Sequence, residues 1–384
     1  MTPINDIFRY LKVTILFCLV FQMMITIDLW SGTEFLFPTT PAFDFIPSDF
    51  LIDIQFYFFL ANLFLLFTML LFERIDWLVA GFLLISTFLV LTNIHRLQVW
   101  FFQMSIMLFF LSFRKNKDGV LKALRFCIIA IYCWSGFHKL NVFYIDDTFP
   151  WFLESTFLHT LGQYKSLAIL SALLEMSIGF GLFFRSSRKW AVGVGILFHL
   201  FILGSLGPWG HDWNIVVWPW NLSMIGLLLI LFFWANQDWR LSIIDDIRQF
   251  PPMIIAILLF GILPALNVFK QWDEQLSFKM YANTNMEGVF YFVEEDKNCF
   301  PNVETSYATL PPSNLPLHRI ILDDWAFKEL HVPPYTSEKI LKRLGKELCK
   351  CLKNPDLGGI EILTVNPWQR NSEKFENFPC TKLE

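Results

Sequence analysis

The sequence is poor in charge, and its basic residues form no stripe. Lys, Arg, Asp and Glu make up 17% of the 384 residues, and the formal net charge is -4. Without a basic stripe to neutralise phosphates, the sequence predicts no nucleic-acid partner. The first apolar stretch also lacks the small-residue cleavage site of a signal peptide, because Thr26, Ile27 and Asp28 follow it. We therefore expect this stretch to stay in the protein as a membrane anchor.

Apolar residues are abundant instead, and they are clustered. Hydrophobic residues make up 55% of the chain and 44 residues are Phe, which is more apolar surface than one soluble core buries. They form successive stretches of about 20 residues, the length that crosses a bilayer. The fold class predicted is a polytopic α-helical membrane protein of about nine spans, with the lipid bilayer as its main partner. The predicted spans cover 11–30, 51–72, 76–93, 97–113, 121–139, 163–184, 190–206, 214–235 and 251–267.

Lys and Arg gather in alternate short loops of this bundle. Loops 31–50, 140–160 and 207–213 contain neither residue type, and Arg96 is a lone exception on the same side. Because basic loops stay cytoplasmic, we expect a cytoplasmic N-terminus and an extracytoplasmic C-terminal region, in a plasma membrane or a bacterial inner membrane. The basic loop residues are Arg114, Lys115, Lys117, Lys122, Arg125, Arg185, Arg188 and Lys189.

The sequence divides into a transmembrane helical bundle over 1–267 and a more polar extracytoplasmic α+β domain over 268–384. In the second part, alternating or β-branched runs predict strands at 276–281, 288–294, 318–323 and 360–366. An apolar stripe predicts a helix over 337–352 that packs on the sheet. In the first part, apolar residues among charges over 237–250 predict a helix at the cytoplasmic interface.

Cysteines are concentrated in the C-terminal domain, which holds four of the seven. An extracytoplasmic domain permits disulfides, so two bridges are expected, with their pairing left open. A metal site is the alternative, but Cys349 and Cys351 are not in a zinc-knuckle spacing. The other two cysteines of the domain are Cys299 and Cys380, while Cys18, Cys127 and Cys133 lie in predicted spans and read as small core residues.

Lys139 is the first candidate functional residue. It ends the fifth predicted span, at the outer rim, and Tyr132 and Ser135 share its helix face. One interpretation is a lysine that extends to lipid headgroups. The other is a functional amine in a polar site.

Glu175 is the second candidate, in the middle of the sixth predicted span. Ser171 and Gly179 lie one turn to either side and leave room for a close neighbour. A carboxyl at this depth must be protonated or paired, and the residues alone leave open whether it is a structural partner or a proton site.

Further polar residues lie towards the same outer side. Asn214, Trp218 and Asn221 are spaced to share one face of the eighth span, where Pro219 predicts a bend. A polar-lined cavity is one interpretation, and an aromatic belt with an ordinary proline kink is the other. His199 in the seventh span and His95 before the fourth complete the set.

These motifs resemble a known family. They are similar to the vitamin K-dependent gamma-carboxylases and their bacterial relatives, the horizontally transferred transmembrane domain (HTTM) proteins, and Lys139 aligns with the lysine of that family. The similar segments are Ser135–Asn141, Phe149–Trp151, Leu174–Phe184, Phe198–His199, Trp272–Met280 and, more loosely, Asn93 with His95.

The resemblance implies a carboxylase-like membrane enzyme that uses a reduced, vitamin K-like quinone. Lys139 would be the base that deprotonates the quinone before oxygen addition and glutamate carboxylation, with His95 and His199 as the groups that tune it. The quinone cavity would be lined by Tyr132, Ser135, Glu175, Asn214, Trp218 and Asn221. An amine can act as this base if desolvation lowers its pKa.

Departures from the family leave other functions open. His138 and Asn141 stand where the carboxylases have a lysine and an aspartate. The region after the last predicted span is also short, so the substrate recognition of the carboxylases cannot be transferred to this sequence. The alternative is a non-catalytic, DoxX-like membrane protein whose outer domain docks a secreted or membrane-bound protein. A solute carrier is a third reading, although no pair of repeats is evident.

Overall fold

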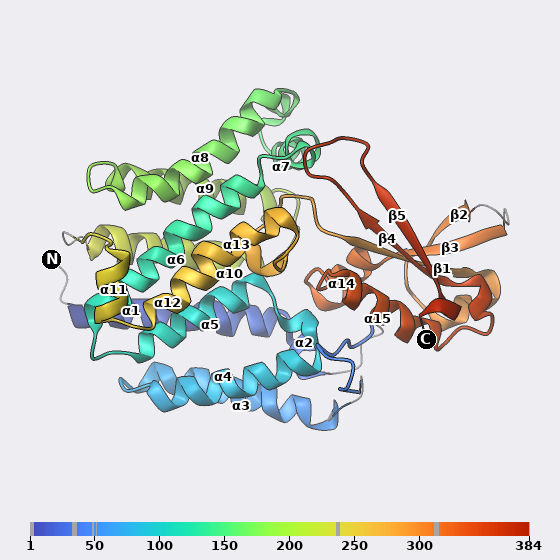
Figure 1. Cartoon of the computed structure of the whole chain (residues 1–384), viewed down its shortest axis with the longest axis horizontal. Helices are drawn as coiled ribbons and strands as arrows, with labels where there is room; N and C mark the ends of the chain where they lie inside the picture. Colours follow the sequence, from blue (N-terminus) through green and yellow to red (C-terminus); the bar gives the residue numbers. More distant parts are fainter. Residues whose placement is uncertain are drawn as a thin grey trace. The chain divides into compact units, whose positions relative to one another are not determined.

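Helices dominate the chain. The computed structural model describes residues 4–32, 37–47, 50, 52–235, 239–310 and 315–383, and most of them are helical (Figure 1). Within these ranges, six helices are long and apolar enough to cross a membrane. They are Ile4–Ile25 (α1), Asp53–Leu71 (in α3, Ile52–Leu71), Lys117–His138 (α6), Lys165–Phe183 (α8), Arg188–Leu206 (α9) and Val217–Trp234 (α10, Val217–Leu228, with the π-helix Leu229–Trp234).

Three shorter apolar helices match the remaining predicted spans. They are Asp76–Thr92 (α4), Val99–Ser112 (α5) and Met253–Phe269, which contains α12 (Met253–Ala256), a π-helix and α13 (Leu263–Leu266). Each predicted span is therefore helical, and six of them have the full spanning length. The count of nine spans stays a prediction.

The chain forms two compact units. The helical unit consists of Met1–Ile25, Leu60–Ser86 and Gln98–Asn283, and the sheet unit consists of Thr26–Phe59, Thr87–Leu97 and Thr284–Glu384. The sheet unit thus combines the C-terminal region with connections between the first helices. The predicted division at 267/268 stays a prediction.

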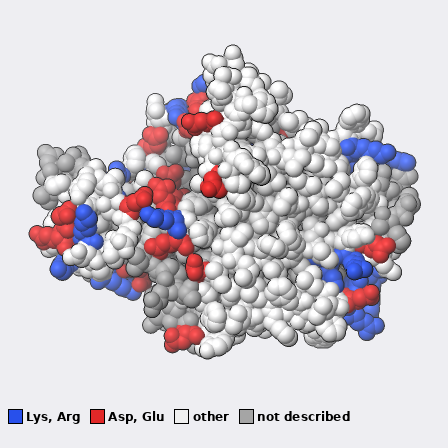
Figure 2. All heavy atoms as spheres, turned by 180° about the vertical axis from the view of Figure 1, so that it is seen from behind, with Lys and Arg blue, Asp and Glu red and all other residues white. Residues whose placement is uncertain are grey.

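The helical unit exposes apolar side chains over a wide surface. Figure 2 shows a broad face of this unit without Lys, Arg, Asp or Glu, with charged side chains gathered at its edge. Phe64, Leu84 and Leu197 are 70%, 75% and 67% exposed. Apolar surface of this extent is typical of a protein that contacts lipid.

The sheet unit is built on five antiparallel strands in the order β2-β3-β1-β4-β5. In the central pair, Phe290 of β1 lies opposite Ile320 of β3 on one side and Ile360 of β4 on the other, and all three are fully buried. This apolar row forms the centre of the unit's core. The strands are Glu287–Val293 (β1), Ser306–Leu310 (β2), Leu315–Ile321 (β3), Gly359–Thr364 (β4) and Lys374–Pro379 (β5).

Two helices complete this part of the unit: α14 (Leu322–Leu330) and α15 (Glu338–Cys349). The side chain of Ser337 caps α15 by accepting a hydrogen bond from the Ile340 N–H. A Cβ at Gly345 would lie 2.8 Å from Ile360 Cγ2, so α15 packs closely on β4 at this glycine. The predicted helix over 337–352 and its packing on the sheet are confirmed.

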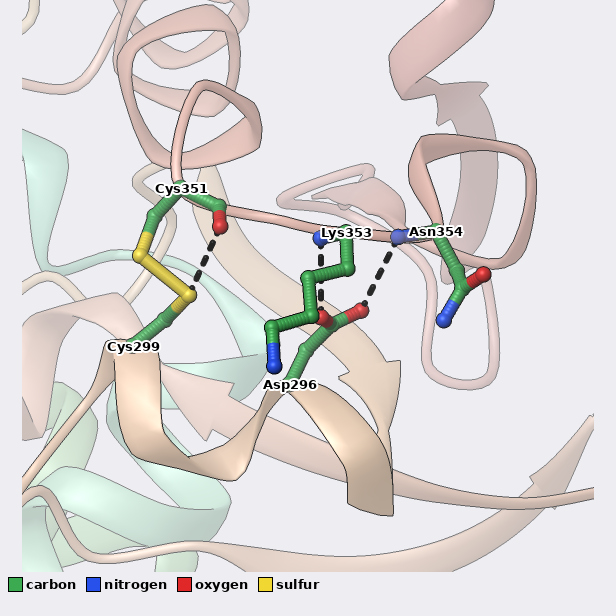
Figure 3. The surroundings of a disulfide bond; sticks show 5 residues. All are labelled: Asp296, Cys299, Cys351, Lys353 and Asn354. Carbon is green, nitrogen blue, oxygen red and sulfur yellow. Dashed lines mark hydrogen bonds between the residues drawn. A yellow bond between two sulfur atoms is a disulfide. The ribbon is translucent and has the colours of Figure 1, made fainter.

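Two disulfides, Cys299–Cys351 and Cys349–Cys380, settle the pairing that the sequence left open. Figure 3 shows the first bridge beside Asp296, whose carboxylate accepts hydrogen bonds from the backbone N–H groups of Lys353 (2.8 Å) and Asn354 (3.4 Å). The bridges are consistent with an extracytoplasmic location of this region. The remaining cysteines, Cys18, Cys127 and Cys133, are free thiols.

Connections between the first helices pack on the C-terminal elements inside the sheet unit. Asp44 pairs with Lys339 at 3.0 Å and also with Arg343, both in α15. The Phe37 N–H donates to Glu329 at 2.8 Å. Segments far apart in sequence are therefore joined here by ion pairs and a hydrogen bond.

Some predicted elements are wrong or incomplete. Residues 276–281 are not a strand, because Gln275–Ser277 is a 3₁₀ turn and Phe278 and Tyr281 have positive φ angles of 57° and 60°. The sequence missed β2, β5 and α14. Over 237–250 the helix is limited to Ile243–Gln249 (α11), and 237–238 lie outside the described residues.

Candidate functional site

Two glycines let α6 and α8 approach each other closely. A Cβ at Gly136 of α6 would lie 2.6 Å from the Ala172 carbonyl oxygen in α8, and one at Gly179 of α8 would lie 2.6 Å from Cys133 Sγ in α6. No larger residue fits at either position without moving a helix. This crossing brings the end of α6 beside the middle of α8.

Lys139 and Glu175 meet at this crossing. Lys139 Nζ lies 2.8 Å from Glu175 Oε2 and donates a second hydrogen bond to Ser135 Oγ at 2.8 Å. Each charged side chain is only 6% exposed. The amine therefore turns into the helical unit, and the predicted alternative of a lysine extended towards headgroups is wrong. Lys139 is the partner of Glu175 that the sequence could not name.

A second hydrogen-bonded chain runs from α6 through α9 to α10. Asn221 Nδ2 donates to the Val217 carbonyl at 2.8 Å, so its Oδ1 is left as an acceptor. His199 Nδ1 lies 2.7 Å from that oxygen and must carry the ring proton, while Nε2 lies 2.6 Å from the Tyr132 hydroxyl. Tyr132 therefore donates to His199, and its oxygen keeps a lone pair for another donor.

The ion pair and the hydrogen-bonded side chains of Tyr132 and His199 border one small cavity, of about 20 Å³. Four of its lining residues are the charged pair together with Tyr132 and His199, and Ser135 is a fifth. A cavity of this size holds about one water molecule. Pockets that hold cofactors usually measure about 300–1,000 Å³, so the reduced quinone implied by the resemblance does not fit here, and no step at this site is assigned to it.

Three predicted residues of the eighth span are placed differently. Asn214 precedes α10 and has a φ of 52°, so it shares no helix face with Trp218 and Asn221. Neither Asn214 nor Trp218 lines the cavity, whereas Asn221 reaches it through His199. Pro219 lies in the first turn of α10, where a missing N–H breaks no helical hydrogen bond, so the predicted bend is wrong.

His95 belongs to the sheet unit. It is fully buried, and its Nδ1 accepts a hydrogen bond from the Tyr335 N–H at 2.9 Å. Burial and the neighbouring Arg96 lower the pKa of His95 to about 3, so the imidazole stays neutral. A neutral ring that holds a backbone N–H has a structural use in this position.

The sequence missed the residues after the last helix that close the cavity. Met280 and Tyr281 line it, and two asparagines hold their segment in place: Asn141 Nδ2 donates to the Ala282 carbonyl and Asn267 Nδ2 to the Trp272 carbonyl, each at 2.9 Å. The similarity over Trp272–Met280 marked this segment, but an expected strand hid its role.

The fold and this cluster define a mostly helical protein with a buried acid–base pair beside a small cavity. No family model, curated protein or solved structure matches the chain. Within the described ranges, no group of three His, Cys, Asp or Glu side chains is placed to hold a metal ion. The side chains around the cavity are therefore the basis of the function proposed below.

Proposed function

We propose that this chain is an integral membrane protein in which Lys139 acts as a general base on a small substrate. The observation that carries the proposal is the ion pair between Lys139 and Glu175, buried on both sides and lining a cavity. Such a pair adds little stability to a helical bundle, because desolvation offsets the attraction between the charges. At the wall of a cavity, the pair instead places an amine beside a carboxylate that can take up its proton.

The pair can exchange its proton internally. When the proton moves from Lys139 Nζ to Glu175 Oε2 across 2.8 Å, both groups become neutral. The amine then carries a lone pair and can accept a proton from a water molecule, or a substrate group of that size, in the cavity.

The hydrogen bonds that join Tyr132, His199 and Asn221 support the same proton transfer. The Tyr132 hydroxyl is fixed by His199, which Asn221 holds in one tautomer. The Tyr132 oxygen is therefore oriented before the substrate arrives, and positioning of this kind lowers the barrier to proton transfer. Lys139 is the base in this arrangement, and His199 and Asn221 are positioning residues.

The membrane topology proposed has nine spans, six of them formed by the long helices and three by the shorter ones. Basic loops on alternate sides support a cytoplasmic N-terminus, and the two disulfides support an extracytoplasmic sheet region. The resemblance of Ser135–Asn141 to the gamma-carboxylase motif supports a base at Lys139.

The double variant Lys139→Met/Glu175→Leu tests the proposal. It removes both charges and leaves no unpaired ion, so we expect a folded, inserted protein that fails to rescue a deletion strain of the source organism. Immunoblots of isolated membranes measure insertion. The matched control is Lys122→Met/Asp246→Leu, which removes an ion pair of the same 2.8 Å length at the other end of α6 and should rescue growth.

Full rescue by the Lys139/Glu175 double variant would refute the proposal that Lys139 acts as a general base. If truncation before residue 268 then abolished rescue, the non-catalytic alternative would be favoured, in which the C-terminal domain docks a secreted partner.

A further inference from the structure

Tyr281 is the exception among the polar side chains that line the small cavity beside Lys139. Its hydroxyl oxygen is buried and has no hydrogen-bond partner in the part of the chain that the structure describes. A buried hydroxyl without a partner has lost the hydrogen bonds that it makes to water in the unfolded chain. The position is therefore one where a bound molecule would be stabilised. Each of the other polar side chains of the lining has at least one partner: Tyr132, Ser135, Lys139, Glu175, His199 and Trp220.

The backbone holds Tyr281 at the cavity in an unfavourable conformation. Its φ of 60° lies in the left-handed region, which a bulky side chain rarely adopts. Asn141, two residues after Lys139, holds the next residue in place by donating to the Ala282 carbonyl at 2.9 Å. Backbone conformations of this kind cost free energy and occur most often at functional sites. The placement of Tyr281 therefore indicates a use for this side chain at the cavity.

Aromatic contacts fix the ring of Tyr281. The ring centroid lies 5.0 Å from that of Phe152 in α7 (Phe149–Glu154), with 85° between the planes, and 6.2 Å from that of Trp213. Tyr281 also packs against the apolar cluster of Phe152, Ile202 and Leu206. Because these contacts involve the ring, a phenylalanine at this position would keep them. The hydroxyl can therefore be removed without removing the packing.

Two further groups at the cavity can each make one more hydrogen bond. The Lys139 ammonium has three N–H donors, and two of them are used by Ser135 and Glu175. The Tyr132 oxygen donates to His199 and keeps a lone pair. With the Tyr281 hydroxyl, the cavity thus offers two donors and one acceptor. A buried water molecule makes about three hydrogen bonds, and the cavity of about 20 Å³ has room for one.

We propose that this cavity binds one water molecule, which the Tyr281 hydroxyl holds between Lys139 Nζ and the Tyr132 oxygen. The water accepts hydrogen bonds from Lys139 and Tyr281 and donates one to Tyr132. It therefore joins the ion pair to the chain of Tyr132, His199 and Asn221. The inference rests on the proposed function in one respect: it gives Lys139 a water molecule as its proton partner and adds Tyr281 as the residue that positions this water.

Crystal structures of the unmodified chain and of Tyr281→Phe, at a resolution that shows ordered water, test the binding site. We expect an ordered water within hydrogen-bond distance of Tyr281 Oη and Lys139 Nζ in the unmodified chain, and its loss in the variant. The control is Tyr291→Phe, which removes a hydroxyl that donates to Asn377 at 2.7 Å in the sheet unit and should keep the water. The site is overturned if the unmodified chain holds no such water, or if Tyr281→Phe keeps it on its other partners.

Rescue of the deletion strain tests whether the water serves the function. At equal protein levels in the membrane, measured by immunoblot, we expect slower growth with Tyr281→Phe and normal growth with Tyr291→Phe. Normal growth with Tyr281→Phe, together with failure of Lys139→Met/Glu175→Leu, would overturn the role of Tyr281 and leave Lys139 as the base. Normal growth with both Tyr281→Phe and the double variant would refute the base as well.

Discussion

Two buried cations of the chain, Lys139 in the helical unit and Arg96 in the sheet unit, are held in opposite ways. In the helical unit, Lys139 and Glu175 neutralise each other and face a cavity. In the sheet unit, Arg96 is fully buried and donates to neutral groups: the Leu29 and Leu89 carbonyls, Thr92 Oγ1 and Gln55 Oε1, at 2.6 to 3.1 Å. Under the proposed function, this difference separates a cation that acts in proton transfer from a cation that only holds the fold together.

The guanidinium of Arg96 uses its fixed fork of donors to join three helices and a turn. Since each partner is a carbonyl, amide or hydroxyl oxygen, no proton can move along these bonds at neutral pH. The Lys139 pair is different, because an amine and a carboxyl group are joined by a direct hydrogen bond. Substitutions that remove the charge of a side chain but keep its approximate size therefore test this comparison directly.

The largest effect is expected from Glu175→Leu, which leaves the Lys139 ammonium buried and unpaired. Loss of one partner of a buried ion pair costs about 3–5 kcal/mol of unfolding free energy. The double variant Lys139→Met/Glu175→Leu should recover most of this loss, to within about 1 kcal/mol of the unmodified chain. Thermal and denaturant unfolding in detergent measure both values. If the single and the double variant lose the same unfolding free energy, the packing of the two side chains, and not their charges, accounts for the loss.

The next effect is expected from Arg96→Met in the sheet unit. This change removes the donors to the Leu29 carbonyl and Gln55 Oε1, and each orphaned acceptor costs about 1–3 kcal/mol. We expect a loss of about 2–4 kcal/mol and, in contrast to the Lys139 variants, no added defect in rescue once protein levels are matched. The exposed Arg248→Met is the control, with an expected change below about 0.5 kcal/mol. A defect in rescue at matched protein levels would contradict the structural role.

The helices and the buried pair show what local pattern can predict. Each apolar stretch formed a helix because length and composition alone decide this in lipid. Lys139 and Glu175 were marked by their position within apolar helices, since a charge there needs a reason. That they face each other could not be read from the sequence, because it depends on the close crossing at Gly136 and Gly179.

The sheet unit shows where local pattern fails. Alternation over 276–281 predicted a strand, but the positive φ angles of Phe278 and Tyr281 turn the chain and place Tyr281 at the cavity. The edge strand β5, Lys374–Pro379, was missed because four of its six residues are exposed and its apolar and polar residues do not alternate regularly. Arg96 appeared only as an exception to the loop charges, since its partners come from residues 29, 55, 89 and 92, which only the fold brings together.

The smallest effect is expected from Asp323→Asn, which examines a third way to hold a buried ionisable group. Asp323 Oδ1 is buried and has no hydrogen-bond partner among the described residues. Burial, with Glu287 and Asp324 nearby, raises the pKa of Asp323 to about 8. Because the ordinary value is about 3.9, the folded chain holds a proton that the unfolded chain releases, and stability falls as pH rises from about 4 to about 8. Asp323→Asn should flatten this slope and stabilise the chain at pH 8 by about 1–3 kcal/mol, measured by unfolding across that pH range. The exposed Asp324→Asn should change the slope less. An unchanged slope in Asp323→Asn would show that this carboxyl is ionised in the folded chain.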